Sequence, residues 1–265
     1  MAVIRKSADG VGVHVDLDAG CRLSSLEVCG HELLLTTGTD PIGWGLYPMV
    51  PYAGRVGRGR FAFGGEDHQL PLTLGGHAIH GSVYRRKWEA ESDSSFVTDL
   101  GPEWPFPGWV RQEIRLGADR IALRLEVHAE GGGMPASCGW HPWFRRMVGG
   151  AEAVLDIRPG FMFERDDGGV ATRKRVPVPD GPWDDCFGDV EPPPVITWPG
   201  VVRLEIESTC EFWVVYSERD DALCVEPQTA PPDALNHDAF VVEPGRPLVA
   251  ECTLRWTGLG DSTGG

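Results

Sequence analysis

Apolar residues alternate with polar ones in this chain, and this period of two constrains the fold more than any other feature. Between residues 121 and 127 every second residue is Ile, Leu or Val, and the residues between them include Arg124 and Glu126. A strand with one buried face has this pattern, whereas an amphipathic helix repeats every 3.6 residues. The chain is therefore predicted to consist of half-buried antiparallel strands. The same alternation occurs at residues 11–17, 202–206, 212–216 and 248–256.

The chain is also rich in residues that make turns. It contains 35 glycines and 22 prolines among 265 residues, whereas average usage would give about 32 of the two together. Because Gly and Pro interrupt helices, a helical bundle or a coiled coil is excluded, and the lack of a Gly-x-y period excludes collagen. Hydrophobic residues make up 42% of the chain, which is enough for a sizeable core and argues against disorder.

We predict an all-β fold with one domain, a single large antiparallel β-sandwich over residues 1–258, followed by a flexible tail at residues 259–265. No internal repeat has a fixed period, which argues against a propeller, and no linker-like segment divides the chain.

Two segments allow a more detailed prediction. Residues 60–72 predict a hairpin that turns at Gly64-Gly65. Residues 201–226 contain neither Gly nor Pro, but their apolar residues still alternate. They therefore predict two strands joined near residues 207–210 rather than a helix.

Charge and cysteine content narrow the partners and the compartment. Lys and Arg number 24 against 39 Asp and Glu, a net charge of -15, so nucleic acid is not an expected partner. No stretch approaches the roughly 18 apolar residues of a membrane span, and the first residues do not form a signal peptide. The seven cysteines contain no C-x-x-C pair, which predicts buried free thiols in a cytoplasmic protein. The oligomeric state is unknown at this stage.

Titratable side chains gather with Gly, Pro and aromatic residues in four segments that resemble loops. Loops on a rigid sheet are where binding and catalytic residues usually lie. Aromatic rings beside polar groups suit a pyranose, which has an apolar C–H face and a rim of hydroxyls. The segments are residues 47–55 (YPMVPYAGR), 77–81 (HAIHG), 139–144 (GWHPWF) and 224–229 (CVEPQT).

The residue types in these segments favour acid–base chemistry. His77 and His80 are three residues apart, but the surrounding glycines disfavour a helix and no nearby Cys or third His completes a set of ligands, so no metal is predicted. Ser82 is not part of a G-x-S-x-G elbow, and the glycines form no phosphate loop. Imidazoles and carboxylates remain, and these need only reach one substrate to act as general acids and bases.

In chain order, the segments YPMVPYAGR, HAIHG, WHPWF, DDCF and VEPQTAPPDALNH resemble the aldose 1-epimerases, the galactose mutarotase-like proteins. The resemblance extends from about residue 43 to residue 247, and its segments follow the order of the family. It implies the galactose mutarotase-like supersandwich, a single antiparallel β-sandwich that agrees with the fold predicted above. It also implies an isomerase that interconverts the α and β anomers of an aldose, with a small sugar as its partner and without a cofactor.

The resemblance further implies roles for individual residues. Glu226 resembles the general base that takes the proton from the anomeric hydroxyl, and His141 resembles the acid that protonates the ring oxygen. His80 is similar to the second histidine, which stabilises charge near the ring oxygen. Arg55 resembles the arginine that orients sugar hydroxyls, and Asp184 resembles the aspartate that holds one of them.

Three assignments stay open. Asp184 has the D-x-x-F spacing to Phe187, but Asp185 lies next to it and is the alternative carboxylate. His77 is either a substrate-binding residue or part of the loop structure. Trp143 is either an aromatic wall of the sugar site or a residue of the core.

Two other functions fit the same residues. A hexose-6-phosphate 1-epimerase would need a cluster of arginines for the phosphate, which Arg85-Arg86 or Arg145-Arg146 could supply. A non-catalytic sugar-binding or regulatory domain would use the acid and the base only to bind. Galactose mutarotases also usually carry Asn before the matching Arg, whereas Gly54 stands in that position, so the resemblance does not identify the aldose.

Overall fold

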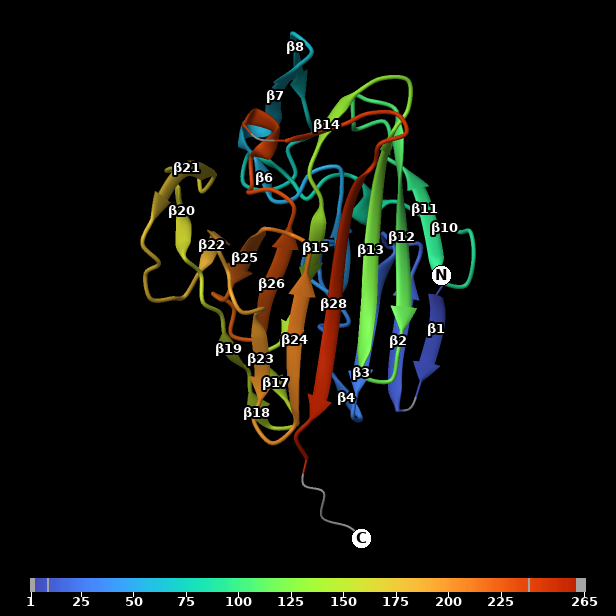
Figure 1. Cartoon of the computed structure of the whole chain (residues 1–265), viewed down its shortest axis with the longest axis vertical. Helices are drawn as coiled ribbons and strands as arrows, with labels where there is room; N and C mark the ends of the chain where they lie inside the picture. The colour runs from blue at the N-terminus through green and yellow to red at the C-terminus, as the bar shows by residue number, and fades with distance from the viewer. Residues whose placement is uncertain (1–2, 9, 238, 261–265) are drawn as a thin grey trace.

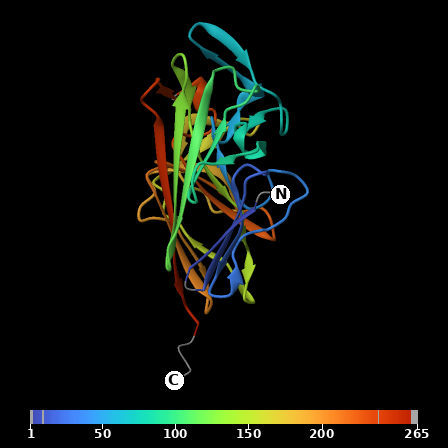
Figure 2. The same ribbon diagram turned by 90° about the vertical axis from the view of Figure 1, so that its right-hand side faces the viewer.

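Two large antiparallel sheets pack face to face, and the side chains between them form the core (Figure 1, Figure 2). The computed structural model describes residues 3–8, 10–237 and 239–260. Within these ranges the only helices are short 3₁₀ turns, and none is long and apolar enough to cross a membrane. The predicted all-β antiparallel sandwich is confirmed.

The larger sheet carries the cleft that is described below. Its 12 strands follow the spatial order β1 (Val3–Ala8), β2 (Val11–Asp16), β3 (Arg22–Val28), β5 (Leu46–Met49), β15 (Gly139–Pro142), β26 (Ala222–Gln228), β25 (Phe212–Tyr216), β22 (Asp184–Gly188), β20 (Phe161–Arg165) and β21 (Ala171–Val176), with β4 (His31–Glu32) beside β3 and β16 (Phe144–Arg145) beside β26.

The second sheet has eight strands, and short pairs of strands and 3₁₀ turns complete the described structure. The eight strands are β10 (Glu89–Ala90), β11 (Ser95–Asp99), β12 (Gly108–Leu116), β13 (Arg120–Ala129), β28 (Leu248–Gly258), β24 (Val202–Ser208), β23 (Val195–Trp198) and β19 (Val154–Asp156). The short pairs are β6 (Arg55–Val56) with β9 (Ala78–Ile79), β7 (Arg60–Phe63) with β8 (Glu66–Gln69), β14 (Met134–Ala136) with β27 (Phe240–Val242), and β17 (Met147–Val148) with β18 (Ala151–Glu152). The 3₁₀ turns are η1 (Gly57–Gly59), η2 (Val83–Arg85) and η3 (Ala234–Asn236).

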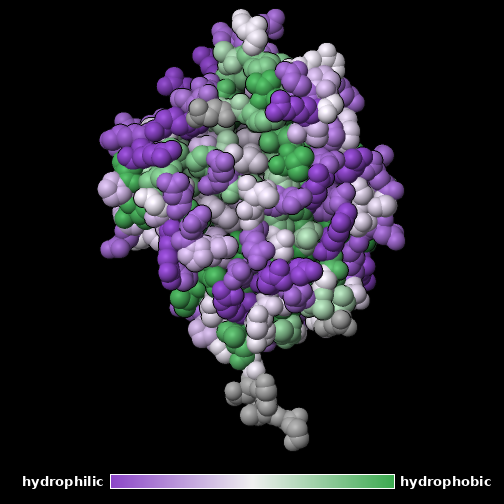
Figure 3. Space-filling view, viewed as in Figure 1, coloured by the Kyte–Doolittle hydropathy of each residue, from purple (hydrophilic) through white to green (hydrophobic). Residues whose placement is uncertain are grey.

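The central strands of the 8-stranded sheet show why the alternation predicted strands. Every second residue of β13, from Ile121 to Ala129, is buried against the other sheet. On the opposite face Arg111 pairs with Glu126 at 3.0 Å, and Arg124 pairs with Glu251 at 3.2 Å. This outer face is largely hydrophilic (Figure 3), as expected for a sheet with one solvated side.

The prediction for residues 201–226 was incomplete. The segment contains β24, β25 and the start of β26, which is three strands rather than two. A turn does follow β24 as predicted, but it carries the chain from the 8-stranded sheet to the 12-stranded sheet instead of closing a hairpin. The second turn, at residues 217–221, was missed because it is polar (SERDD) and contains no Gly or Pro. By contrast, the hairpin with its turn at Gly64-Gly65 is confirmed.

The expectation that the four site segments are loops was wrong in large part. They contain β5, β6, β9 and β15, the start of β16, and most of β26. All residues of β15 and β26 are buried. Because these strands are covered on both faces, they lack the alternation that reveals a half-exposed strand.

The cysteines and the C-terminal segment complete the comparison with the predicted fold. All seven cysteines are free and six are buried, as predicted, but Cys29 is exposed. In the predicted tail, the Leu259 amide donates a hydrogen bond to the Val201 carbonyl at 2.9 Å. Residues 261–265 of that tail lie outside the described residues, so the domain boundary at residue 258 stays a prediction.

We expect Gly81→Ala to destabilise the fold far more than Gly76→Ala on the other side of β9. Both glycines have positive φ, +75° at Gly81 and +82° at Gly76. An Ala in that conformation is destabilising by about 1–2 kcal/mol at either position. A Cβ on Gly81 would lie 1.9 Å from the Val50 carbonyl oxygen, whereas a Cβ on Gly76 meets nothing within 4 Å. Urea unfolding should therefore show a loss above about 3 kcal/mol for Gly81→Ala. Equal losses in the two variants would contradict the close approach.

Candidate active site

The register of the 12-stranded sheet brings the proposed acid and base together. Gly139 of β15 pairs with Gln228 of β26, so the antiparallel register places His141 beside Glu226. Glu226 in turn pairs with Val214 of β25. Residues that pair directly across neighbouring antiparallel strands project their side chains from the same face of the sheet. His141, Glu226 and Val214 therefore all face one cleft.

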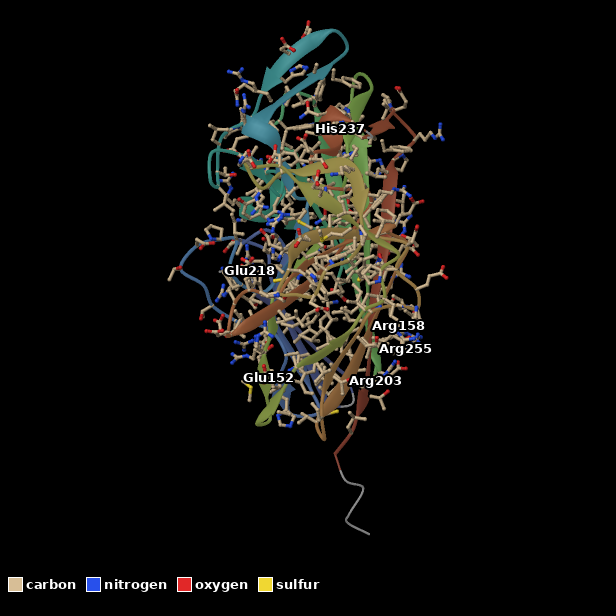
Figure 4. All side chains as sticks on the ribbon, turned by 90° about the vertical axis from the view of Figure 1, so that its left-hand side faces the viewer. Glu152, Arg158, Arg203, Glu218, His237 and Arg255 are labelled. Carbon is tan, nitrogen blue, oxygen red and sulfur yellow. The ribbon has the colours of Figure 1, made fainter. Side chains whose placement is uncertain are left out.

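The cleft has a volume of about 880 Å³, large enough for a sugar. Charged side chains and aromatic rings line it. The lining also includes two exposed apolar side chains, Leu72 and Leu74. Glu218 also lines it, and Figure 4 shows this residue on the opposite side of the molecule from Arg203 and Arg255 of the 8-stranded sheet. The sequence-predicted residues on its wall are Arg55, His80, His141, Trp143, Asp184 and Glu226, together with the alternative carboxylate Asp185.

His141 and Glu226 form a buried pair at the floor of this cleft. The His141 Nε2 and Glu226 Oε1 atoms lie 3.1 Å apart, with side chains 6% and 2% exposed. Burial, reinforced by the charge of Asp184, raises the pKa of Glu226 well above its usual value. Burial, reinforced by His80, lowers the pKa of His141 well below its usual value. Since both shifts oppose charge, the two groups are best described as one unit that holds a single proton between them.

Gln228 was missed as a site residue, although it belongs to the E-P-Q segment. Its Nε2 donates a hydrogen bond to Glu226 Oε2 at 3.2 Å, so His141 and Gln228 hold the two carboxyl oxygens separately. The side chain is fully buried, and its Oε1 has no hydrogen-bond partner among the described residues. Gln228 lines the cleft two residues after Glu226. The period of two could therefore have identified it once Glu226 was chosen.

His80 reaches the cleft through an unusual backbone conformation. Its φ is +61°, which is uncommon for a residue other than glycine, and its amide donates to the Gly54 carbonyl at 3.0 Å. The ring lies edge-on to the His141 ring with centroids 4.9 Å apart. Burial, followed by the charge of Arg55, lowers the pKa of His80 to about 3, so the ring is neutral near pH 7.

Aromatic rings fix the orientation of the His141 imidazole. The His141 ring stacks on Tyr47, with centroids 5.0 Å apart, and on Trp143, with centroids 4.9 Å apart. The Trp143 indole donates to the Ile42 carbonyl at 2.6 Å. Trp143 is thus buried in an aromatic cluster and also part of the cleft wall.

A buried arginine packs against the Tyr47 ring of this aromatic cluster. Arg22 is fully buried and donates to the carbonyls of Pro41 at 2.7 Å and Trp44 at 2.8 Å. Its guanidinium also lies 4.9 Å from the centre of the Tyr47 ring. Burial lowers the pKa of Arg22 to about 10, so it stays charged near pH 7. No sequence pattern indicates this role of Arg22.

Arg55 and Asp184 lie at the far side of the cleft and are paired with each other. Arg55 Nη2 is 3.1 Å from Asp184 Oδ2, and Arg165, which was not predicted, contacts the same oxygen at 3.2 Å. Arg165 Nε also contacts Asp185 Oδ1 at 2.8 Å. Asp184 precedes Cys186 by two residues, and the register aligns Cys186 with Val214 and Val214 with Glu226. The register therefore favours Asp184, although both carboxylates line the cleft.

The P-D-x-x-N-H segment, whose Pro232 lines the cleft, holds the backbone at Arg55. The Asp233 amide donates to the Arg55 carbonyl at 2.7 Å, and Asp233 Oδ1 accepts from the Gly57 amide at 2.8 Å. Asn236 Nδ2 donates to the same carboxylate oxygen at 2.9 Å. Asp233 thus holds the backbone at Arg55, the first residue of β6, and at Gly57, directly after the strand.

His77 is not brought into the cleft. Its Nδ1 accepts a hydrogen bond from the Arg58 amide at 3.1 Å, and the residue lines a separate hollow beside Asp166 and Asp233. This placement favours the loop-structure alternative over substrate binding. Among the described residues, the donor atoms that come close enough together for a metal ion belong instead to His141, Cys224 and Glu226.

The chain belongs to the aldose 1-epimerase family, whose model matches residues 17–255. A relative in Escherichia coli K12, uncharacterized protein YphB, is 32% identical over 104 residues, and the match covers 37% of this chain and only 36% of that protein. A galactose mutarotase-like protein of Clostridium acetobutylicum has a similar structure (TM-score 0.82, 18% identity, 97% of this chain and 95% of that chain). So does galactose 1-epimerase from Lactobacillus acidophilus (TM-score 0.79, 16% identity, 98% and 95% covered). At these identities the two structures establish a shared fold.

The low pKa of His80 predicts a measurable effect on stability. The unfolded chain binds a proton at this residue below about pH 6.5, whereas the folded chain does not until about pH 3. The free energy of unfolding should therefore fall as the pH falls through this window, by about 2 kcal/mol between pH 7 and pH 5 from His80 alone. Urea unfolding of His80→Gln should show a shallower pH dependence than the unsubstituted protein. Identical slopes would show that His80 titrates normally in the folded state.

Proposed function

We propose that this protein is an aldose 1-epimerase that acts on a free, unphosphorylated aldose. The observation that carries the proposal is the contact between His141 and Glu226, an acid and a base 3.1 Å apart at the floor of a sugar-sized cleft. Family membership supports the reaction class. The assignments of individual residues to steps rest on this geometry and on the motifs they occupy.

Ring opening needs one proton removed and one supplied at neighbouring oxygens. Glu226 takes the proton of the O1 hydroxyl while His141 gives a proton to the ring oxygen. The C1–O5 bond breaks and C1=O1 forms. The open aldehyde rotates about C1–C2, and the same two groups reverse their roles as the ring closes on the other face. Positioned groups of this kind contribute about 10²–10⁴-fold each.

The shared proton explains how the pair can start from either anomer. The pair holds one proton before and after ring opening, on His141 in one state and on Glu226 in the other. Burial favours the uncharged state, and the 3.1 Å contact lets the proton pass from Glu226 to His141 before a cyclic sugar reacts. Gln228 donates to the carboxyl group and so favours its ionised form. We therefore assign Gln228 a positioning role.

The remaining cleft residues hold the sugar while C1 moves. His80 is neutral near pH 7 and can share a hydrogen bond with the ring oxygen without competing as an acid. Arg55 and Asp184 can donate to and accept from the distal hydroxyls, and Trp143 offers an apolar ring beside them.

The arginines favour a free sugar over a phosphorylated one. Of the two arginine pairs considered from the sequence, only Arg85 lines the cleft, and it already contacts Glu103 at 3.2 Å. The other cleft arginines are also paired with carboxylates: Arg55 and Arg165 with Asp184, and Arg219 with Asp221 at 2.7 Å. A phosphate would have to displace these partners.

Anomer exchange measured by NMR or polarimetry tests the proposal. We expect the protein to accelerate exchange of at least one free aldose, and Glu226→Gln to lower the rate by about 10²–10⁴-fold. Glu218→Gln is the matched control, because Glu218 lines the same cleft but is exposed and lies outside the buried pair. If no sugar in a panel of free and 6-phosphorylated aldoses exchanges faster than with Glu226→Gln, the epimerase function is wrong. Binding without exchange would instead support a sugar-binding domain, and faster exchange of the phosphorylated sugars would support the hexose-phosphate alternative.

Gln228 provides a second test of the same site. Gln228→Leu removes the donor to Glu226 Oε2, so the carboxylate loses a hydrogen bond that favours its ionised form. We expect kcat to fall by about tenfold and the basic group in the pH–rate profile to titrate at higher pH. Gln228→Asn, which keeps the amide, should recover part of both changes. An unchanged pH profile in Gln228→Leu would show that Gln228 does not act through Glu226.

A further inference from the structure

Cys224 places a thiol beside the acid–base pair, where the proposed reaction has no use for one. Cys224 precedes Glu226 by two residues on β26, so the two side chains project from the same face of the strand. Each of His141, Cys224 and Glu226 offers one ligand atom, and these three atoms lie within 4.8 Å of one another. All three residues are buried, while His141 and Glu226 also line the cleft.

An imidazole nitrogen, a thiolate sulfur and one carboxylate oxygen are the donors that zinc prefers. Zinc sites with three protein ligands keep a fourth position for water, and here that position can open into the cleft. Hard ions such as Mg²⁺ and Ca²⁺ prefer a shell of oxygen atoms, which this set does not supply. The donor chemistry therefore selects a borderline ion such as Zn²⁺.

The geometry is close to what such an ion needs. Ligand atoms about 2.0–2.3 Å from a tetrahedral zinc are about 3.5 Å from one another. The His141 and Glu226 atoms are already 3.1 Å apart. The three atoms lie within 4.8 Å of one another, so the thiol must approach by about 1.3 Å at most to complete the set.

We propose that His141 Nε2, Cys224 Sγ and Glu226 Oε1 form a binding site for Zn²⁺ in which the ion acts as an inhibitor. The ion would occupy the nitrogen and the carboxylate oxygen between which the proton moves, so a protein with zinc bound cannot carry out the proposed exchange. Zinc takes the thiolate, the free imidazole nitrogen and the carboxylate, so the thiol proton of Cys224 and the proton shared by His141 and Glu226 both leave to solvent on binding. Zinc binding itself does not rest on the proposed function, because it can be measured without a sugar.

Cys186 supplies a matched control. It is a second buried thiol, it lines the same cleft, and it lies in the same row of the sheet as Glu226 with Val214 between them. Its sulfur is not one of the three clustered ligand atoms. A general effect of losing a buried thiol close to the cleft would therefore appear in both cysteine variants, whereas the proposed site depends on Cys224.

The experiment is calorimetric titration of the metal-free full chain with Zn²⁺, followed by absorption spectroscopy with Co²⁺. We expect one Zn²⁺ per chain and a thiolate-to-cobalt absorption band. Cys224→Ser should weaken Zn²⁺ binding at least about tenfold and abolish the band, whereas Cys186→Ser should retain both. His141→Ala, which removes a different ligand, should also weaken binding and provides an independent test if Cys224→Ser does not fold.

Inhibition of anomer exchange by Zn²⁺, reversed by a chelator, is the expected consequence in an active protein. Failure of the unsubstituted protein to bind Zn²⁺, equal affinity in Cys224→Ser, or an equal loss in Cys186→Ser would each overturn the proposed site. These outcomes are independent of activity. A protein that binds zinc as expected but exchanges no sugar would contradict the proposed function and leave the metal site standing.

Discussion

The strand register of the 12-stranded sheet is the constraint on which the site depends. In β15 and β26, core residues alternate with cleft residues: Trp140 and Val225 are fully buried in the main core, while their neighbours His141 and Glu226 face the cleft. A shift of one residue would exchange the two faces and bury the polar pair in the core. The hydrophobic core therefore fixes the positions of His141 and Glu226 through the same strands that carry them.

Burial shifts the pKa values of His141 and Glu226 in the directions that oppose charge, and it also requires that any charge on the pair be compensated. A buried charge is unfavourable unless it is paired and hydrogen-bonded, and here His141 and Gln228 contact the two oxygens of Glu226 separately. The other charges around the site are compensated in a similar way. Arg22 is surrounded by backbone carbonyls, and Arg55 is paired with Asp184. The cleft thus combines low exposure with hydrogen bonds and ion pairs to its charged groups.

The sequence predicted the strands that have one solvated face better than those that carry the site. Alternation identified β13 and β28, whereas β15 and β26 are buried on both faces and show no such pattern. The segments on β15 and β26 were singled out by their titratable and aromatic residues but were expected to be loops, and the roles of their residues came only from the resemblance of short motifs. The sequence left the role of His77 open, and in the structure His80, in a left-handed conformation, lines the cleft while His77 lines a separate hollow. No sequence pattern indicated Arg165 as a site residue, since its position in the cleft depends on strand β20 lying beside β22.

Gly54 shows why the substrate preference of a family member cannot be assigned to this chain from the identity of one residue. Gly54 has a φ of +69°, and a Cβ there would lie 2.7 Å from the Pro232 side chain. Pro232 is adjacent to Asp233, which holds the backbone at Arg55. An Asn at residue 54 would therefore push on the element that positions the arginine, and the side chain at this position and the Pro232–Asp233 segment must change together. In this chain residue 54 supplies no side-chain amide, and the polar side chains on this side of the cleft include Arg55, Asp184 and the neighbouring Arg165.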